Sequence, residues 1–145
     1  MISPTSTANN LYTFDTEYAG KPMKEWVTAA HKDMSLKSGW KYFPLSPGTF
    51  GYDNQAHSLG HVFDNYEDGM NRDQIASLVH EGWCINYLFW RDHKPWLKDK
   101  SYKAPSKPLN DKRRNECTAQ TYDQLPQDEK DKDLMIADYI LSQTQ

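Results

Sequence analysis

The side chains that could do chemistry recur along one stretch of the sequence, IASLVHEGWCINYLFWR (75–91). At intervals of three or four residues this stretch carries His80, Cys84, Tyr87 and Arg91. In a helix this spacing places them along one edge. A guanidinium binds phosphate through two parallel hydrogen bonds, and an aromatic ring stacks on a base. This edge therefore indicates a binding site for an anionic, aromatic ligand. The same spacing is also explained by a structural role, in which the tyrosine packs in the core and its two neighbours are exposed.

Residues 91–114 form a basic segment with nine of the 17 Lys and Arg residues, three acids and three prolines. The prolines predict a long loop, and loops of this length are usually functional or disordered. Arg113 and Arg114 suit bidentate phosphate contact, and Trp96 can cover a base. A solvated charged connection explains the segment equally well. The net charge of −3 argues against a nucleic-acid partner.

Two more polar side chains are candidates for the ligand site. Asn86 lies in the middle of an apolar helical arc, and a buried amide without a hydrogen bond costs about 1–3 kcal/mol. Its partner is therefore either the backbone or the edge of a ligand. Tyr122 precedes the last helix, and we expect its hydroxyl to anchor that helix while its ring also faces the site.

The sequence does not support a catalytic or metal site. His57 and His61 are four residues apart, as metal-binding pairs on helices are, but no third ligand and no metalloprotease glutamate accompanies them. Cys84 and His80 lack a third orienting group and an oxyanion loop. We therefore expect a non-enzymatic protein with no cofactor and no metal.

The elements that position these residues are expected to be helices. Patterns of apolar residues predict helices over residues 22–35, 72–90 and 126–142. Asn71 caps the second of these, whose broad apolar arc indicates a central helix. The glycine- and proline-rich segment 37–55 is expected to be loop or short extended structure. Only three valines occur, so the fold class predicted is mainly α, with α+β as the alternative.

Length and composition predict one aromatic-rich domain over residues 11–145, after a flexible Ser/Thr/Asn-rich arm over residues 1–10. The 145-residue chain carries 19 aromatic residues, as many as Ile, Leu and Val together. No apolar window approaches about 18 residues, and no signal pattern is present. The two cysteines show neither metal nor redox spacing. We therefore expect a cytoplasmic protein with no membrane partner.

Two segments carry a resemblance to a known family. The stretch TYDQLPQDEKDKDLMIADYIL (121–141) resembles the closing segment of the ryanodine-receptor-type repeat, or RyR domain. That segment has a tyrosine, an acid, Leu-Pro, charged residues and an apolar helix. The matching positions are Tyr122, Asp123, Leu125, Pro126, Glu129, Lys130, Lys132, Asp133 and the run from Leu134. The family's opening helix is similar to IASLVHEGWCINY, through Ile75, Ala76 and His80.

The resemblance implies a compact helical domain with long loops and few short strands, and no enzymatic activity. As a free-standing bacterial or phage-type member, the chain would bind a small anionic nucleotide-type ligand. A viral anti-defence sponge that sequesters a cyclic or NAD-derived nucleotide immune signal is the most specific form of this hypothesis. The alternative is a protein–protein interaction module with no small-molecule ligand, whose basic loop docks an acidic surface. Homo-oligomer formation stays open.

Overall fold

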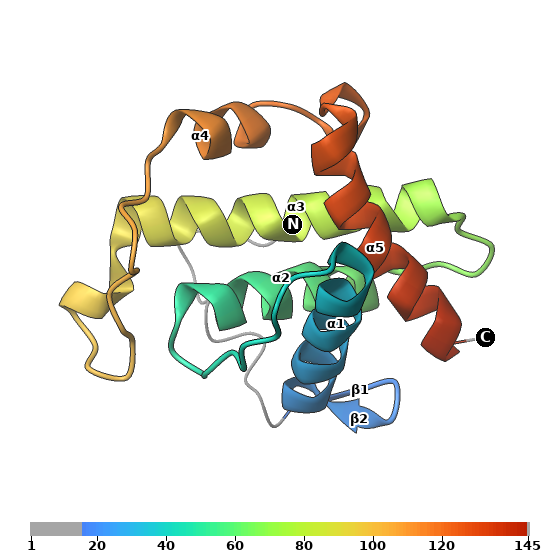
Figure 1. Ribbon diagram of the computed structural model, residues 1–145, viewed down its shortest axis with the longest axis horizontal. Helices are drawn as coiled ribbons and strands as arrows, with labels where there is room; N and C mark the ends of the chain where they lie inside the picture. Colours follow the sequence, from blue (N-terminus) through green and yellow to red (C-terminus); the bar gives the residue numbers. More distant parts are fainter. Residues whose placement is uncertain (1–15, 145) are drawn as a thin grey trace.

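The structure, a computed structural model, describes residues 16–144, which fold into a mainly α domain (Figure 1). The predicted fold class is thus confirmed, whereas the arm predicted over residues 1–10 lies outside the described residues. No helix within 16–144 is long and apolar enough to cross a membrane. The strands and α-helices in chain order are β1 (Glu17–Tyr18), β2 (Lys21–Pro22), α1 (Met23–Ser38), α2 (Phe50–Asn65), α3 (Arg72–His93), α4 (Lys112–Thr118) and α5 (Gln127–Thr144). Two short 3-10 helices, η2 (Pro95–Leu97) and η3 (Tyr122–Gln124), precede α4 and α5.

Helix α3 is the central element, as its apolar arc predicted. It runs the length of the molecule, with α2 packed along it and α5 crossing it (Figure 1). Its start is fixed by a capping box, in which Asn71 Oδ1 accepts from the Gln74 backbone N–H at 2.8 Å. The Gln74 side chain accepts in return from the Asn71 backbone N–H at 2.9 Å. These two bonds satisfy donors that the first helical turn leaves free.

Helix α2 was not predicted from the sequence, and the loop expected over residues 37–55 ends before Phe50. Thr49 caps the helix by accepting from the Tyr52 backbone N–H at 3.2 Å. The helix packs closely on α3 because Gly82 has no side chain. A Cβ at Gly82 would collide with the His57 carbonyl. The pattern around Pro47, Gly48 and Gly51 indicated a loop, but packing on α3 stabilises a helix there instead.

In the basic segment, residues 91–93 still belong to α3 and Pro95–Leu97 form a short 3-10 helix, and the rest is loop as far as residue 111. The prediction of a loop over residues 91–114 is therefore wrong at both ends. At the second end Asp111 caps α4 by accepting from the Arg114 backbone N–H at 3.1 Å. The last proline of the segment lies before this cap, so nothing opposes a helical turn. The loop is held on the domain by its aromatic residue Trp96, which stacks on Trp90 with ring centroids 5.6 Å apart.

The segment before α5 locks that helix against the start of α3. The Tyr122 hydroxyl donates to Asp73 Oδ1 at 3.0 Å, and Leu125 is 5% exposed. Burial and, after it, the hydrogen bond and charge of the Asp73 carboxylate raise the pKa of Tyr122 to about 12. The hydroxyl therefore stays protonated and keeps donating across the physiological range. The anchoring role expected for this tyrosine is confirmed.

Truncation of the buried leucine of this lock is expected to destabilise the fold. Leu125→Ala removes apolar contact and leaves a cavity, which should lower the free energy of unfolding by about 2–5 kcal/mol. Urea unfolding followed by circular dichroism measures the change. Leu36→Ala is the matched control, because Leu36 is 83% exposed. Equal stability of the Leu125 variant and this control would contradict the lock.

Candidate functional site

A cavity of about 210 Å³ opens where α2, α3, α4 and α5 meet. Helix α2 contributes Phe50, Asn54 and Gln55, and α3 contributes His80 and Trp83. The remaining charged residues come from α4 and α5. They are Arg113, Arg114, Glu129, Lys132 and Asp133. Aromatic rings, amides and cations thus meet in one hollow that four segments distant in sequence create.

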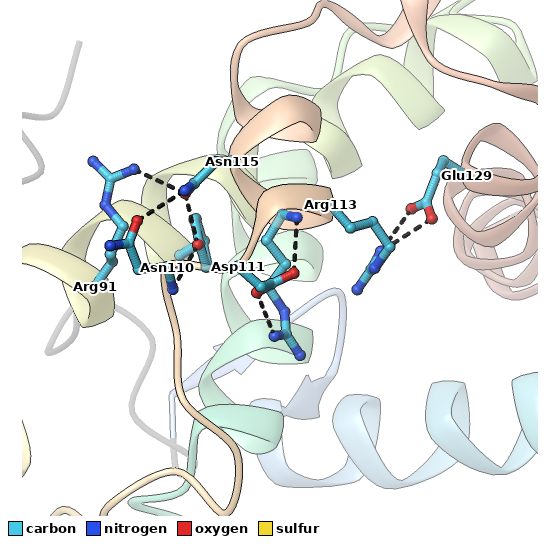
Figure 2. Close-up of polar contacts among 8 residues, drawn as sticks. Arg91, Asn110, Asp111, Arg113, Asn115 and Glu129 are labelled. Atoms are coloured by element: carbon cyan, nitrogen blue, oxygen red, sulfur yellow. Dashed lines mark hydrogen bonds and ion pairs between the residues drawn. The ribbon is translucent and has the colours of Figure 1, made fainter.

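Two arginines of α4 reach the cavity in different ways. Arg113 Nη1 donates to both oxygens of Glu129, at 3.0 and 3.2 Å, and so ties α4 to α5 (Figure 2). Arg114 Nη1 donates to Asp111 Oδ1 at 2.8 Å, and its guanidinium lies 5.7 Å from the centroid of the Phe50 ring. The Arg114 side chain is 23% exposed, so it is held in place yet remains accessible.

Glu129 is the carboxylate that two of the cavity cations share. Lys132 Nζ donates to it at 3.2 Å, in addition to Arg113. Its side chain is only 14% exposed. Burial by itself would raise the pKa of Glu129, but the hydrogen bonds and charges of Lys132 and Arg113 outweigh burial and hold the pKa below its ordinary value. Glu129 is therefore ionised at neutral pH.

Asp133, one turn further along α5, has the opposite electrostatic character. Burial and, after it, the Glu129 charge together raise the pKa of Asp133 to about 8, although the Lys132 ammonium opposes them. At neutral pH this carboxyl is consequently protonated and is a neutral hydrogen-bond donor. Its Oδ2 lies 3.8 Å from His80 Nδ1, beyond hydrogen-bond distance.

Cys84, His80 and Asp133 have the outline of a catalytic triad, but their hydrogen bonds do not fit one. The Gln120 carbonyl lies 2.8 Å from His80 Nε2 and can only accept, so this nitrogen carries the proton. A protonated Nε2 cannot take a proton from the Cys84 thiol, whose Sγ lies 3.5 Å away. Burial also raises the pKa of Cys84 to about 12. The thiol is therefore not activated as a nucleophile.

The eight residues predicted as a ligand site fall into separate places. His80, Arg113 and Arg114 line the cavity described above. Arg91 and Trp96 line a second, wider depression of about 670 Å³ beside the basic loop. The structure therefore brings three of the predicted residues together and places two others elsewhere.

The remaining three predicted residues are buried. The Tyr87 hydroxyl donates to Asn115 Oδ1 at 2.8 Å and accepts from the Asn110 backbone N–H at 3.0 Å. Arg91 Nη1 donates to the same Asn115 oxygen at 3.1 Å, as Figure 2 shows. Tyr87 thus holds the end of the basic loop on α3. Tyr122 binds Asp73, as described for the lock.

Asn86 on α3 and Asp53 and His57 on α2 are buried polar side chains, and together they form a polar seam between the two helices. Asn86 is fully buried, and neither atom of its amide makes a hydrogen bond to a described residue. One turn further along α3, Trp90 Nε1 donates to Asp53 Oδ2 at 3.1 Å. Burial raises the pKa of Asp53 to about 7 and lowers the pKa of His57, also in α2, to about 4. The backbone partner predicted for Asn86 is therefore not found among the described residues, and its role at the edge of a ligand stays a prediction.

The sequence analysis named three of the cavity residues and missed the others, among them Phe50, Asn54, Gln55 and Trp83. Phe50, Asn54 and Gln55 lie on α2, which was taken for a loop, so no face could be assigned to them. Trp83 was placed on the apolar arc, but its ring reaches the cavity and stacks on Tyr87 with centroids 5.4 Å apart. An aromatic residue at the edge of an apolar arc was the available signal.

The histidine pair His57 and His61 does not form a metal site. His57 is 3% exposed in the seam, and His61 Nε2 bonds Glu81 Oε2 at 2.9 Å. Within residues 16–144 no group of three His, Cys, Asp or Glu side chains could hold a metal ion.

Comparisons with known proteins give no match that bears on function, so the functional proposal rests on the cavity. No family model matches the chain, and no match was found among curated proteins or solved structures. The resemblance to the ryanodine-receptor-type repeat rests on the motifs quoted above.

Proposed function

We propose that this protein binds a small anionic ligand of nucleotide type in the cavity between α2, α3, α4 and α5, without converting it. The observation that carries this proposal is the convergence of three cations, Arg113, Arg114 and Lys132, beside the rings of Phe50 and Trp83. Guanidinium and ammonium groups bind phosphate, and aromatic rings stack on a base for about 1–3 kcal/mol. A phosphorylated heterocycle uses both kinds of group.

The size and walls of the cavity suit one nucleoside-sized group. Its volume of about 210 Å³ is below the roughly 300–1,000 Å³ of sites for drug-sized molecules. Asn54 Oδ1 and Gln55 Oε1 are buried and accept no hydrogen bond from a described residue. A buried acceptor without a partner costs about 1–3 kcal/mol, so donors on a ligand would stabilise the site. The amino group of a base is such a donor.

Holding the ligand is the activity that these residues support. The protonated Nε2 of His80 and the protonated thiol of Cys84 provide no nucleophile and base pair. A protein that binds a nucleotide without converting it acts by sequestering it or by presenting it to a partner. With the ryanodine-receptor-type resemblance, we propose sequestration of a nucleotide signal, as a phage-type protein would perform it against host defence.

Loss of one cavity arginine is expected to weaken nucleotide binding. Arg114→Gln removes a charge-assisted hydrogen bond, which contributes about 1.5–3 kcal/mol, so affinity should fall roughly tenfold or more. A thermal-shift screen of mono-, cyclic and dinucleotides identifies the best ligand, since a ligand at 100 times its Kd adds about 2.7 kcal/mol of stability. Titration calorimetry then compares the variants.

Lys98→Ala is the matched control for the arginine variant. It removes the same charge from an exposed position that does not line the cavity. We expect parent affinity for this control. A screen in which no nucleotide raises the melting temperature of the folded parent would contradict the proposed function.

A protein-interaction module is the second candidate, and one observation favours it. Leu36, Trp40 and Phe43 are 83%, 44% and 63% exposed, at the end of α1 and in the loop after it. Exposed apolar groups that lie close together are typical of protein contacts. Under this alternative, Trp40→Ser and Phe43→Ser would abolish binding to a partner protein and leave every nucleotide titration unchanged.

A further inference from the structure

We infer that the cavity selects a singly charged phosphate, that is, a phosphate diester such as a nucleoside cyclic monophosphate, over a doubly charged phosphate monoester. This inference rests on the proposed function and names the chemical class of its ligand. It follows from how the cavity cations are already paired.

Three cations line the cavity, and two ionised carboxylates pair with them: Glu129, which lines the cavity, and Asp111, which does not. Arg113 and Lys132 share Glu129, at 3.0 and 3.2 Å, and Arg114 pairs with Asp111 at 2.8 Å. Three positive and two negative charges leave a surplus of one positive charge. One negative charge on a ligand neutralises that surplus.

A second negative charge on the ligand would meet repulsion instead of a partner. Any phosphate that touches Arg113 or Lys132 also approaches the Glu129 carboxylate, which both of them bind. Like charges at short range in a partly buried site disfavour each other strongly. A monoester carries a charge of roughly −1.5 to −2 at pH 7 and a diester about −1, so only the monoester suffers this repulsion.

Asp133 strengthens the preference for a diester. Its carboxyl lines the cavity next to Glu129 on the same face of α5, with His80 of α3 on the other side at 3.8 Å. Burial and the Glu129 charge both keep this carboxyl protonated at neutral pH. It offers the ligand one neutral donor, whereas a dianion beside it would add to the unfavourable negative charge. The other charged and titratable groups that interact with Asp133 are Lys132, Cys84 and Tyr122.

The test compares pairs of probes that differ in the charge of the phosphate and in the closure of the phosphate ring onto the 3′-hydroxyl. The 3′,5′-cyclic monophosphates and the 5′-monophosphates of the four ribonucleosides have the same bases, sugars and number of phosphates. Titration calorimetry with the full chain at pH 7.5 should give at least about tenfold tighter binding of the cyclic form for the base that binds best. At pH 5.0 the monoester takes up a proton, because its second pKa is about 6, and the two affinities should converge.

A variant of the shared carboxylate should change this selectivity. Glu129→Gln keeps an oxygen that can accept from Arg113 but removes the charge, so the surplus becomes two. We expect the monophosphate to gain affinity in this variant until it equals or exceeds the cyclic form. Glu116→Gln is the control, because Glu116 lies on α4 with its side chain 61% exposed and outside the cavity, and it should keep the parent ratio.

The outcomes separate this inference from the proposed function. Tighter binding of the 5′-monophosphate by the parent at pH 7.5 would overturn the charge selectivity and leave nucleotide binding intact. Binding of neither form of any nucleotide would overturn the proposed function itself. The comparison of probes needs only the parent protein, so it stays decisive even if the Glu129 variant does not fold.

Discussion

The free energy of unfolding is expected to fall as the pH rises from 6.5 to 8, by about 2.5 kcal/mol. Asp53 and Asp133 have folded-state pKa values of about 7 and about 8, against an ordinary value of 3.8. Within this window the folded state binds more protons than the unfolded state. Unfolding therefore releases protons, and raising the pH favours it.

A loss of stability as the pH rises identifies the two carboxyls as its cause, because the lowered pKa of His57 cannot produce it. Burial lowers the pKa of His57 from 6.5 to about 4, so His57 destabilises the fold only as the pH falls below 6.5. The stability from the two carboxyls is fully present below about pH 4 and is lost as the pH passes 7 for Asp53 and 8 for Asp133. Above pH 6.5 the change of stability with pH therefore comes from Asp53 and Asp133 and not from His57.

Asparagine variants measure how much each carboxyl contributes to the fall of the free energy of unfolding with pH. Asp133→Asn should remove about two thirds of the fall between pH 6.5 and 8, and Asp53→Asn the rest. Asp128→Asn, on the exposed first turn of α5, is the matched control and should keep the parent slope. Urea unfolding at pH 6.5, 7.25 and 8 measures all four proteins. A parent stability that rises with pH across this window would contradict the assigned protonation of both carboxyls.

Local sequence signals predicted α3 and the segment that precedes α5. Asn71 and Gln74 form the capping box that begins α3, and the apolar arc of that helix predicts its central place. The Tyr122 and Leu125 lock was also predicted, because a tyrosine and Leu-Pro before an apolar helix form a local pattern. In these segments the residues that decide the structure are close together in the sequence.

The cavity could be predicted only in part, because it depends on contacts between distant segments. Arg113 and Arg114 were predicted as phosphate ligands from residue type, yet the partner of Arg113, Glu129, depends on where α5 crosses α3. The acids and lysine of α5 did carry a signal that was not used for the site. Glu129, Lys132 and Asp133 are three and four residues apart and must share one face of a helix.

Tyr87 shows why the edge of a helix does not identify a ligand site. The spacing that linked Tyr87 to His80 and Arg91 is real, but the tyrosine is fully buried and its hydroxyl holds the basic loop. Which part of an edge faces a cavity depends on what packs over it. Here the end of the basic loop covers the part of the helix edge around Tyr87, whereas the part around His80 lines the cavity beside α5.

Gly82→Ala is expected to destabilise the fold by about 3 kcal/mol, although alanine favours a helix over glycine by about 1 kcal/mol. A Cβ at Gly82 would collide with the backbone carbonyl of His57 and lie 2.9 Å from His61 Cβ. Neither atom is the end of a flexible side chain, so α2 must move away from α3. The close contact of these helices also sets the distance between Phe50 and Trp83 across the cavity, and nucleotide affinity should fall with stability.

Gly51→Ala is the control that separates close packing from helix propensity. Gly51 also lies in a helix, but its Cβ would meet only the flexible end of the Leu45 side chain, at 3.0 Å. Helix propensity then dominates, and this variant should be as stable as the parent or up to about 1 kcal/mol more stable. Opposite signs for the two glycine variants in urea unfolding are the expected result. Stabilisation by both would mean that α2 and α3 are not in close contact at Gly82, and the cavity that their contact shapes would lose its support.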